Sequence, residues 1–302
     1  MKTIDAFEKD INLQTEFLKF FKKQKPISEK DQKNIIFTGS GDSLASAMLA
    51  ESFSKFRARS MDPLDLFKNK SILKNKTVYF VSISGNTISN IKVAKQAKTA
   101  IAITSKSNSR LAKSCNSSIL LQSQNSDVFT AGSISFLETA LTCISLVTSF
   151  VLPKNNSIFQ KAKIDAKKSK IGKRIFILGD MYTYPVAMYC AAKFFELIGY
   201  DAHFEKIEQF SHMELFSTKK EDTVIIFEEK NHHNSLLVKN LKNVGLNVIH
   251  PTLNSKNKTS QIIYYTFFSQ LLPLFEAKKQ KKKDCHFVIS KKLRKVSDNM
   301  IY

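Results

Sequence analysis

One short segment of the chain, residues 82–87, brings together side chains that could bind an anion. It reads Ser82-Ile83-Ser84-Gly85-Asn86-Thr87 and joins an apolar run typical of a buried strand to a predicted helix. Gly85 would let a ligand approach the backbone, and free N–H groups at the helix start would add partial positive charge. The hydroxyl and amide groups of Ser82, Ser84, Asn86 and Thr87 would suit a phosphate monoester. The alternative is an ordinary turn whose hydroxyls cap the helix.

A second turn, residues 39–43, follows an earlier predicted strand and reads Gly39-Ser40-Gly41-Asp42-Ser43. It is not a complete GxGxxG dinucleotide motif, because residue 44 is leucine, and no GK[ST] phosphate loop occurs in the chain. Ser40, Asp42 and Ser43 would instead form a wall of a binding pocket at the carboxyl end of the strand.

The elements that must position these turns are predicted from apolar runs. Strands are expected at 34–38, 78–83, 100–104, 118–123, 175–178, 222–229 and 248–251, with helices after most of them and a closing helix at 259–279. Strands that alternate with helices predict βαβ units and a parallel sheet. The order of strand, glycine turn and helix starts again near residue 174, so we expect two copies of one α/β domain.

The expected organisation is an N-terminal amphipathic helix (1–25), a first domain (26–155) that carries both turns, and a second domain with a C-terminal tail (165–302). The N-terminal segment lacks the continuous apolar core of a signal peptide, and no apolar run is long enough to span a membrane. The expectation is therefore a cytoplasmic protein without a membrane partner.

The formal net charge of +21 attracts anions in general. Its densest cluster is the lysine run at 278–283, which lacks interleaved aromatic residues, and no nucleic-acid-binding motif accompanies it. A solvated basic loop is favoured over a nucleic-acid-binding arm. The four cysteines are widely spaced and form no CxxC pair, so buried thiols are expected and no metal site is predicted.

The two turns and the repeated layout resemble the sugar isomerase (SIS) family, in which SxSGxT follows a strand and GxGxS lies about forty residues earlier. Ser84 to Ile88, SGNTI, resembles the archaeal phosphoglucose/phosphomannose isomerases. Residues 184–187, Tyr-Pro-Val-Ala, resemble a helix start in the isomerase half of glucosamine-6-phosphate synthase. The resemblance covers roughly residues 34–295. It implies tandem SIS domains, each a parallel five-stranded, flavodoxin-like sheet in a three-layer α/β/α arrangement.

The same resemblance implies site residues. Glu196 matches the family's catalytic glutamate and His212 its ring-opening histidine. Lys193 matches a family lysine and is expected to bind the substrate. The segment AGSISF (131–136) places Ser133 near the sugar. Residue types alone favour a different interpretation, in which Glu196 is a surface acid paired with Lys193 at the i, i+3 spacing and His212 is a surface residue. The match to the family favours the functional roles. In the family this histidine comes from a second subunit, which implies a homodimer with shared active sites.

The family also has a lysine near its C-terminus that reaches the open-chain sugar. An ungapped match assigns this role to Lys292, with Lys291 and Lys295 as alternatives. Two departures concern the substrate. No arginine occurs between Arg110 and Arg174 to stabilise an enediolate, and Asp42 stands where the synthase has threonine.

These observations favour a metal- and cofactor-independent aldose–ketose isomerase that acts on fructose 6-phosphate and glucose 6-phosphate, or on a mannose or glucosamine analogue. A carboxylate would move a proton between C1 and C2, and a histidine would open the ring. The main alternative is an SIS protein that senses a sugar phosphate without converting it. Nucleic-acid binding is the third hypothesis, and it rests on the net charge alone.

Overall fold

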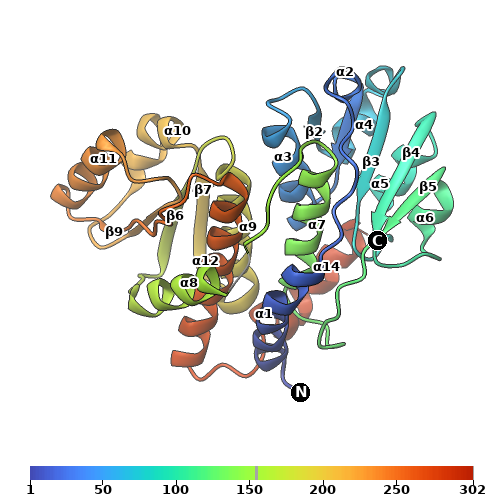
Figure 1. Cartoon of the computed structure of the whole chain (residues 1–302). Coiled ribbons are helices and arrows are strands. Elements are labelled where there is room, and N and C mark those ends of the chain that lie inside the picture. Colours follow the sequence, from blue (N-terminus) through green and yellow to red (C-terminus); the bar gives the residue numbers. More distant parts are fainter. Residues whose placement is uncertain (154–155, 302) are drawn as a thin grey trace. The chain divides into compact units, whose positions relative to one another are not determined.

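A computed structural model describes residues 1–153 and 156–301, which divide into two compact units (Figure 1). The five-stranded unit comprises residues 20–125, 132–150 and 290–301. The four-stranded unit comprises residues 1–19, 126–131, 151–153 and 156–289. The units interleave along the chain, so the domain boundaries expected from the sequence stay predictions. Residues 155 and 302, at two of those boundaries, lie outside the described residues.

The five-stranded unit contains a wholly parallel sheet in the order β2-β1-β3-β4-β5, which is the flavodoxin-like order (Figure 1). Its strands are β1 (Ile35–Thr38), β2 (Arg59–Met61), β3 (Thr77–Val81), β4 (Thr99–Thr104) and β5 (Ser117–Leu120). Its helices are α2 (Glu29–Gln32), α3 (Asp42–Phe53), α4 (Pro63–Lys68), η1 (Lys70–Leu73), α5 (Ile88–Ala94), α6 (Arg110–Ser114), α7 (Ile134–Ser145) and α14 (Lys291–Ile301).

Alternate residues of these strands enter two separate cores. Phe37, Tyr79 and Ile103 pack with residues of α3 and α7 on one face of the sheet. Ile36 and Phe80 pack with residues of α4, α5 and α6 on the other face. The apolar runs of β1 and β3 therefore reflect a sheet that is covered on both sides.

The four-stranded unit contains a second parallel sheet, in the order β7-β6-β8-β9. Its strands are β6 (Arg174–Leu178), β7 (Asp201–Glu205), β8 (Thr223–Ile226) and β9 (Asn247–Ile249). Its helices are α1 (Thr3–Phe20), α8 (Ser157–Lys168), α9 (Tyr184–Ile198), α10 (Ile207–His212), η2 (Glu214–Ser217), α11 (His232–Asn243), α12 (Lys258–Lys279) and α13 (His286–Ile289).

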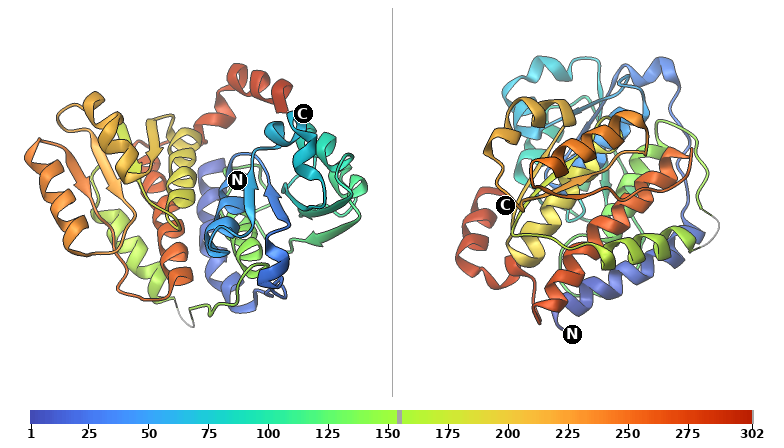
Figure 2. Two further views of the ribbon diagram at one scale, coloured as in Figure 1. Left: turned by 90° about the horizontal axis from the view of Figure 1, so that it is seen from above. Right: turned by 90° about the vertical axis from the view of Figure 1, so that its left-hand side faces the viewer.

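Helices also cover both faces of this sheet (Figure 2). Phe176 and Val224 pack against α10 and α11, whereas Phe227, just after β8, stacks on Tyr265 of α12 with ring centroids 4.8 Å apart. The expectation of five strands was wrong for this sheet, which has four among the described residues. After β9 the chain runs through Pro251 directly into α12, without the helix and edge strand that follow β4.

Two strands were not predicted from the sequence, β2 and β7. Both are edge strands beside the first strand of their sheet, and their side chains are largely half-buried or exposed. An edge strand with polar residues lacks the continuous apolar run that marks a central strand, so its pattern is weak.

The C-terminal end of α9 depends on Gly199, which adopts the left-handed conformation (φ +71°). A Cβ there would lie 2.7–2.8 Å from ring atoms of His286. We expect Gly199→Ala to lower the free energy of unfolding by about 1–3 kcal/mol, because it adds backbone strain and a steric clash. Urea unfolding would measure this. Gly172→Ala, at a position without a positive φ, is the control and should cost less.

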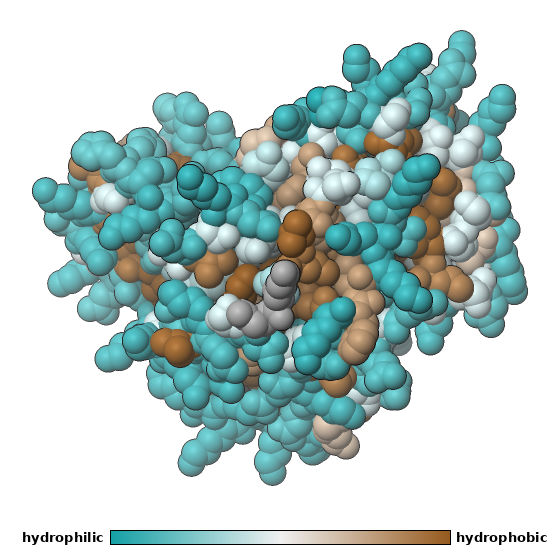
Figure 3. Space-filling view, viewed as in Figure 1, coloured by the Kyte–Doolittle hydropathy of each residue, from teal (hydrophilic) through white to brown (hydrophobic). Residues whose placement is uncertain are grey.

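No helix of the described chain is long and apolar enough to cross a membrane. Hydrophilic side chains cover much of the face seen in Figure 3. The lysine run at 278–283 begins in the last turn of α12 and is mostly exposed, and Lys278 pairs with Glu8. Three cysteines are buried, and Cys115 is half-buried, with burial raising its pKa to about 11.

Candidate functional site

The strand order of the five-stranded unit reverses between β1 and β3. These strands are hydrogen-bonded neighbours, yet α3, which follows β1, packs on one face of the sheet and α5, which follows β3, on the other. The two turns therefore diverge at the carboxyl ends of these strands, which is the place where open α/β sheets bind ligands. We call this place the β1–β3 corner, made by residues 39–43 and 82–87.

Residues 82–87 form a compact loop at this corner. The backbone N–H of Gly85 donates to the hydroxyl of Ser82 (3.2 Å), and the Asn86 N–H donates to that of Ser84 (3.3 Å). Thr87 is the N-cap of α5, but its side chain makes no capping hydrogen bond. The Thr87 hydroxyl lies 3.5 Å from the Ser82 hydroxyl instead. The alternative interpretation, in which the hydroxyls cap the helix, does not describe this loop.

The end of β4 holds the loop in place. The hydroxyls of Thr104 and Ser105 both donate to the backbone carbonyl of Ile83, at 3.0 and 2.9 Å. Gly85 has φ +64°, and a Cβ at this position would lie 2.2 Å from the Ser109 hydroxyl oxygen. Only glycine fits here, and the loop geometry depends on it.

The other half of the corner begins directly after β1. A Cβ at Gly39 would lie 2.8 Å from that of Ser43, and Gly41 has φ +58°, so the backbone turns tightly into α3. Ser40 is exposed and Asp42 half-buried. A Cβ at Gly132 would lie 2.6 Å from an Asp42 carboxylate oxygen, so the chain just before Ser133 reaches this turn. Ser133 itself is buried at the start of α7.

Two buried polar atoms near this corner were not predicted from the sequence. The Thr38 hydroxyl, at the end of β1, and the Asn90 side-chain oxygen, in the first turn of α5, have no hydrogen-bond partner among the described residues. Buried polar atoms are normally paired with protein, water or ligand. Both belong to the elements that form the corner, so a bound polar ligand or water could satisfy them.

Glu196 and Lys193 lie on α9 in the four-stranded unit and form an ion pair. The alternative reading predicted this pair, but Lys193 is not a surface residue. Its side chain is fully buried, and its Nζ lies 4.7 Å from the ring centroid of Tyr189, whereas the side chain of Glu196 is 32% exposed. The Tyr189 hydroxyl accepts a hydrogen bond from Gln270 (3.0 Å). Glu196 is thus a carboxylate at the surface, held by a buried cation.

His212 is the last residue of α10 and is exposed. Lys291, Lys292 and Lys295, the three C-terminal lysines considered for the site, are all exposed on α14. Their exposure therefore does not select one of them for the site.

The four-stranded unit has its own corner between β6 and β8, made by residues 179–183 and 227–229. There the Glu228 carboxylate accepts hydrogen bonds from the Thr183 hydroxyl (2.6 Å) and the Asp180 N–H (3.1 Å). Burial raises the pKa of Glu228 despite these two bonds, and burial also raises the pKa of Asp180. His250 contacts the Glu228 backbone oxygen at 2.9 Å, and burial lowers its pKa.

The raised pKa of Glu228 gives a pH-dependent stability. Because the fold favours the neutral carboxyl, the contribution of Glu228 to stability is greatest below its ordinary pKa of about 4.5 and falls as the pH rises through the folded value. Glutamine does not titrate and so does not share this loss. The melting temperature of Glu228→Gln minus that of the wild type should therefore increase between pH 4 and pH 8. Glu229→Gln, at an exposed neighbour, is the control. A difference in melting temperature that instead decreases as the pH rises would contradict the prediction.

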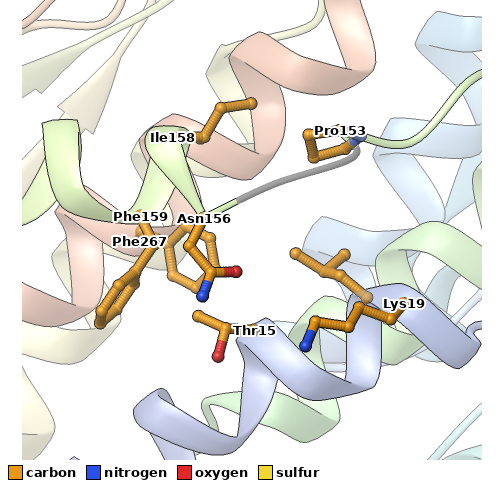
Figure 4. A pocket seen from close by; sticks show the side chains of 8 residues that line it. Thr15, Lys19, Pro153, Asn156, Ile158, Phe159 and Phe267 are labelled. Atoms are coloured by element: carbon orange, nitrogen blue, oxygen red, sulfur yellow. The ribbon is translucent and has the colours of Figure 1, made fainter.

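A separate small pocket lies in the four-stranded unit, formed by α1, α8 and α12 (Figure 4). Its walls are Thr15, Leu18, Lys19, Pro153, Asn156, Ile158, Phe159 and Phe267. Its aromatic wall is closed by an edge-to-face contact of Phe159 and Phe267, with centroids 5.1 Å apart. It contains none of the predicted site residues.

Residues 171–265 match the family model of the SIS domain. The match spans the whole β7-β6-β8-β9 sheet and the first turns of α12, and it does not extend over the five-stranded sheet. No curated protein matches the chain.

Solved structures with the same fold cover nearly the whole chain. A glucosamine-6-phosphate deaminase from Thermotoga maritima is 17% identical, over 94% of this chain and 96% of that one, with a TM-score of 0.68. The C-terminal domain of glucosamine-fructose-6-phosphate aminotransferase from Francisella tularensis is 15% identical, over 91% and 95%, with a TM-score of 0.65. The tagatose-6-phosphate ketose/aldose isomerase from Escherichia coli is 14% identical, over 93% and 91%, with a TM-score of 0.63. At such identities the likeness shows a shared fold.

Proposed function

Because residues 171–265 match the SIS domain model, we propose that the chain binds a phosphorylated sugar and interconverts its aldose and ketose forms. The observation that carries the proposal is the β1–β3 corner. It lies where the strand order reverses, and its hydroxyls do not cap the following helix.

We further propose that the five-stranded unit is a second SIS domain. Its strands β2-β1-β3-β4 run in the same order as β7-β6-β8-β9, and both sheets are wholly parallel.

The phosphoryl group is proposed to bind at residues 82–87. The hydroxyls of Ser82, Ser84 and Thr87 and the Asn86 amide can donate to its oxygens. The backbone N–H groups of Ser84 and Thr87, which have no partner in the described chain, can donate as well. On the β1 side, Ser40, Asp42 and Ser43 would contact the sugar phosphate, and Ser133 would lie near the sugar.

The reaction is proposed to pass through an enediol. Glu196 would take the proton from C2 of the open-chain aldose and return it to C1, while the proton of the C2 hydroxyl passes to the C1 oxygen. This gives the ketose and regenerates the carboxylate. Lys193 would hold this carboxylate in place through the ion pair. His212 would open the ring, and Lys292 would contact the open-chain sugar. The proposal requires Glu196, from this chain or from a second copy, to reach C1 and C2, and we propose a homodimer with shared sites.

Fructose 6-phosphate and glucose 6-phosphate are the proposed substrates, with a mannose or amino-sugar analogue as the alternative pair. One of the similar structures is a glucosamine-6-phosphate deaminase and another is a tagatose-6-phosphate ketose/aldose isomerase, which supports this class of substrate and reaction.

A two-part experiment tests the proposal. Melting temperatures are measured with fructose, glucose, mannose and glucosamine 6-phosphates, and with inorganic phosphate as the control for anion binding. Each sugar that raises the melting temperature more than phosphate does is then tested for turnover in a coupled assay. Stabilisation with turnover is the expected result, and the lack of any sugar-specific stabilisation would overturn the proposal.

A second candidate is a protein that binds a sugar phosphate without converting it. The exposed position of His212 and the engagement of Glu196 by a buried lysine favour it. Stabilisation by a phosphosugar without turnover would select this function.

A further inference from the structure

The corners of the two units are built on the same backbone plan. In the five-stranded unit Thr38, the last residue of β1, pairs with Phe80, and in the four-stranded unit Leu178, the last residue of β6, pairs with Ile226. A glycine follows each strand, and its absent Cβ leaves room for the residue four positions later. That residue is Ser43 after Gly39 and Thr183 after Gly179, with closest approaches of 2.8 Å in both cases.

Other features of the turns repeat as well. The residue three positions beyond each strand has a positive φ, +58° at Gly41 and +41° at Met181. The N–H of Ser43 donates to the Ser40 carbonyl (3.2 Å), as that of Thr183 donates to the Asp180 carbonyl (2.8 Å). Ser40 therefore corresponds to Asp180, and Ser43 to Thr183.

The register then equates Ser82 with Glu228. Each lies two residues beyond the residue that pairs with the end of the first strand, namely Phe80 and Ile226. One corner thus has a neutral hydroxyl at the position where the other has a carboxylate. That carboxylate accepts from the Asp180 N–H and the Thr183 hydroxyl, which are the counterparts of the Ser40 N–H and the Ser43 hydroxyl.

We infer that Glu228 fills the β6–β8 corner as a built-in anion, so that each chain keeps one open corner for a phosphoryl group. The closed corner also indicates which donors an external anion meets in the open one, the Ser40 N–H and the Ser43 hydroxyl. The statement about the open corner rests on the proposed function, whereas the closure by Glu228 does not.

Burying the Glu228 carboxylate at this corner is energetically unfavourable, which supports a specific role for it. It is a partly buried carboxylate next to Asp180, and burial raises the pKa of both groups. The positive charge of Lys258 lowers the pKa of Glu228, and the charges of Lys206 and His233 lower that of Asp180. Burial has the larger effect on both carboxyl groups. A serine, the residue at the corresponding position 82, would avoid a second carboxylate next to Asp180.

The test exchanges the two residues. Equilibrium dialysis with radiolabelled inorganic phosphate counts the anions bound per chain at saturation. We expect one for the wild type, two for Glu228→Ser, none for Ser82→Glu, and one for the double exchange. Adding Thr183→Val to Glu228→Ser should remove the second phosphate. Glu228→Gln, which retains the shape but not the charge, is the matched control and should stay at one.

The outcomes separate the inference from the proposed function. If Glu228→Ser still binds one phosphate while Ser82→Glu binds none, Glu228 does not close a latent site, and the proposed function stands. If Ser82→Glu binds phosphate and fructose 6-phosphate as the wild type does, the β1–β3 corner is not the site and the proposed function fails.

Folding of each variant is checked by circular dichroism and thermal melting. If Ser82→Glu does not fold, Ser43→Val replaces it and should weaken fructose 6-phosphate binding at least about tenfold, because one hydrogen bond to a charged group is lost. Unchanged affinity in Ser43→Val would overturn the assignment of the donors. If Glu228→Ser does not fold, Glu228→Ala takes its place with the same expected count of two.

Discussion

Glu196→Gln should reduce aldose–ketose interconversion by about 10²–10⁴-fold while phosphosugar binding is retained. The amide cannot accept the proton from C2, so the step through the enediol loses its base. The phosphate contacts proposed for the β1–β3 corner do not involve Glu196, so the Kd for fructose 6-phosphate should change little. Turnover is measured in the coupled assay and binding by calorimetry.

Stability must be controlled in this experiment, because glutamine leaves the fully buried Lys193 ammonium with a neutral partner. We therefore expect a lower melting temperature, and the assays are run well below it. Glu16→Gln is the matched control, since Glu16 pairs with Lys19 at the same i, i+3 spacing but both side chains are exposed. Full activity in Glu196→Gln would remove this residue from the mechanism, and loss of binding would mean that it contacts the phosphosugar in another role.

Gly85→Ala should weaken fructose 6-phosphate binding by at least about a hundredfold. The residue has φ +64°, which is strained for alanine, and the new Cβ would lie 2.2 Å from the Ser109 hydroxyl oxygen and 2.4 Å from the Ser109 Cβ. The loop must shift, and the donors of Ser82, Ser84 and Thr87 would no longer converge on one anion, a misplacement that costs several hydrogen bonds. Calorimetry gives the change in Kd.

The matched control is Gly245→Ala in the other unit. Gly245 also has a positive φ (+88°), but a Cβ there would meet only the flexible side chain of Lys220. This variant should lose stability through the same backbone strain and bind fructose 6-phosphate as the wild type does. If a folded Gly85→Ala binds the sugar equally well, the loop at residues 82–87 does not hold the phosphoryl group.

The class of fold and the position of the β1–β3 corner could be predicted from the amino-acid sequence. Apolar runs at β1, β3, β6 and β8 are continuous because these central strands are covered on both faces, and the polar turns after them stand out for the same reason. Gly85 and its hydroxyl neighbours could be found from residue types alone, since the chemistry of an anion site resides in a few consecutive residues.

Features that depend on pairing between distant segments could not be predicted from the sequence and became visible in the folded chain. Lys193 and Glu196 are close in sequence, but whether the pair is at the surface or buried is set by the packing of α9 against α12. The edge strands β2 and β7 exist because a neighbouring strand offers hydrogen bonds, and their own residues carry little signal. The correspondence of Ser82 with Glu228 needs the strand register, which no local pattern contains.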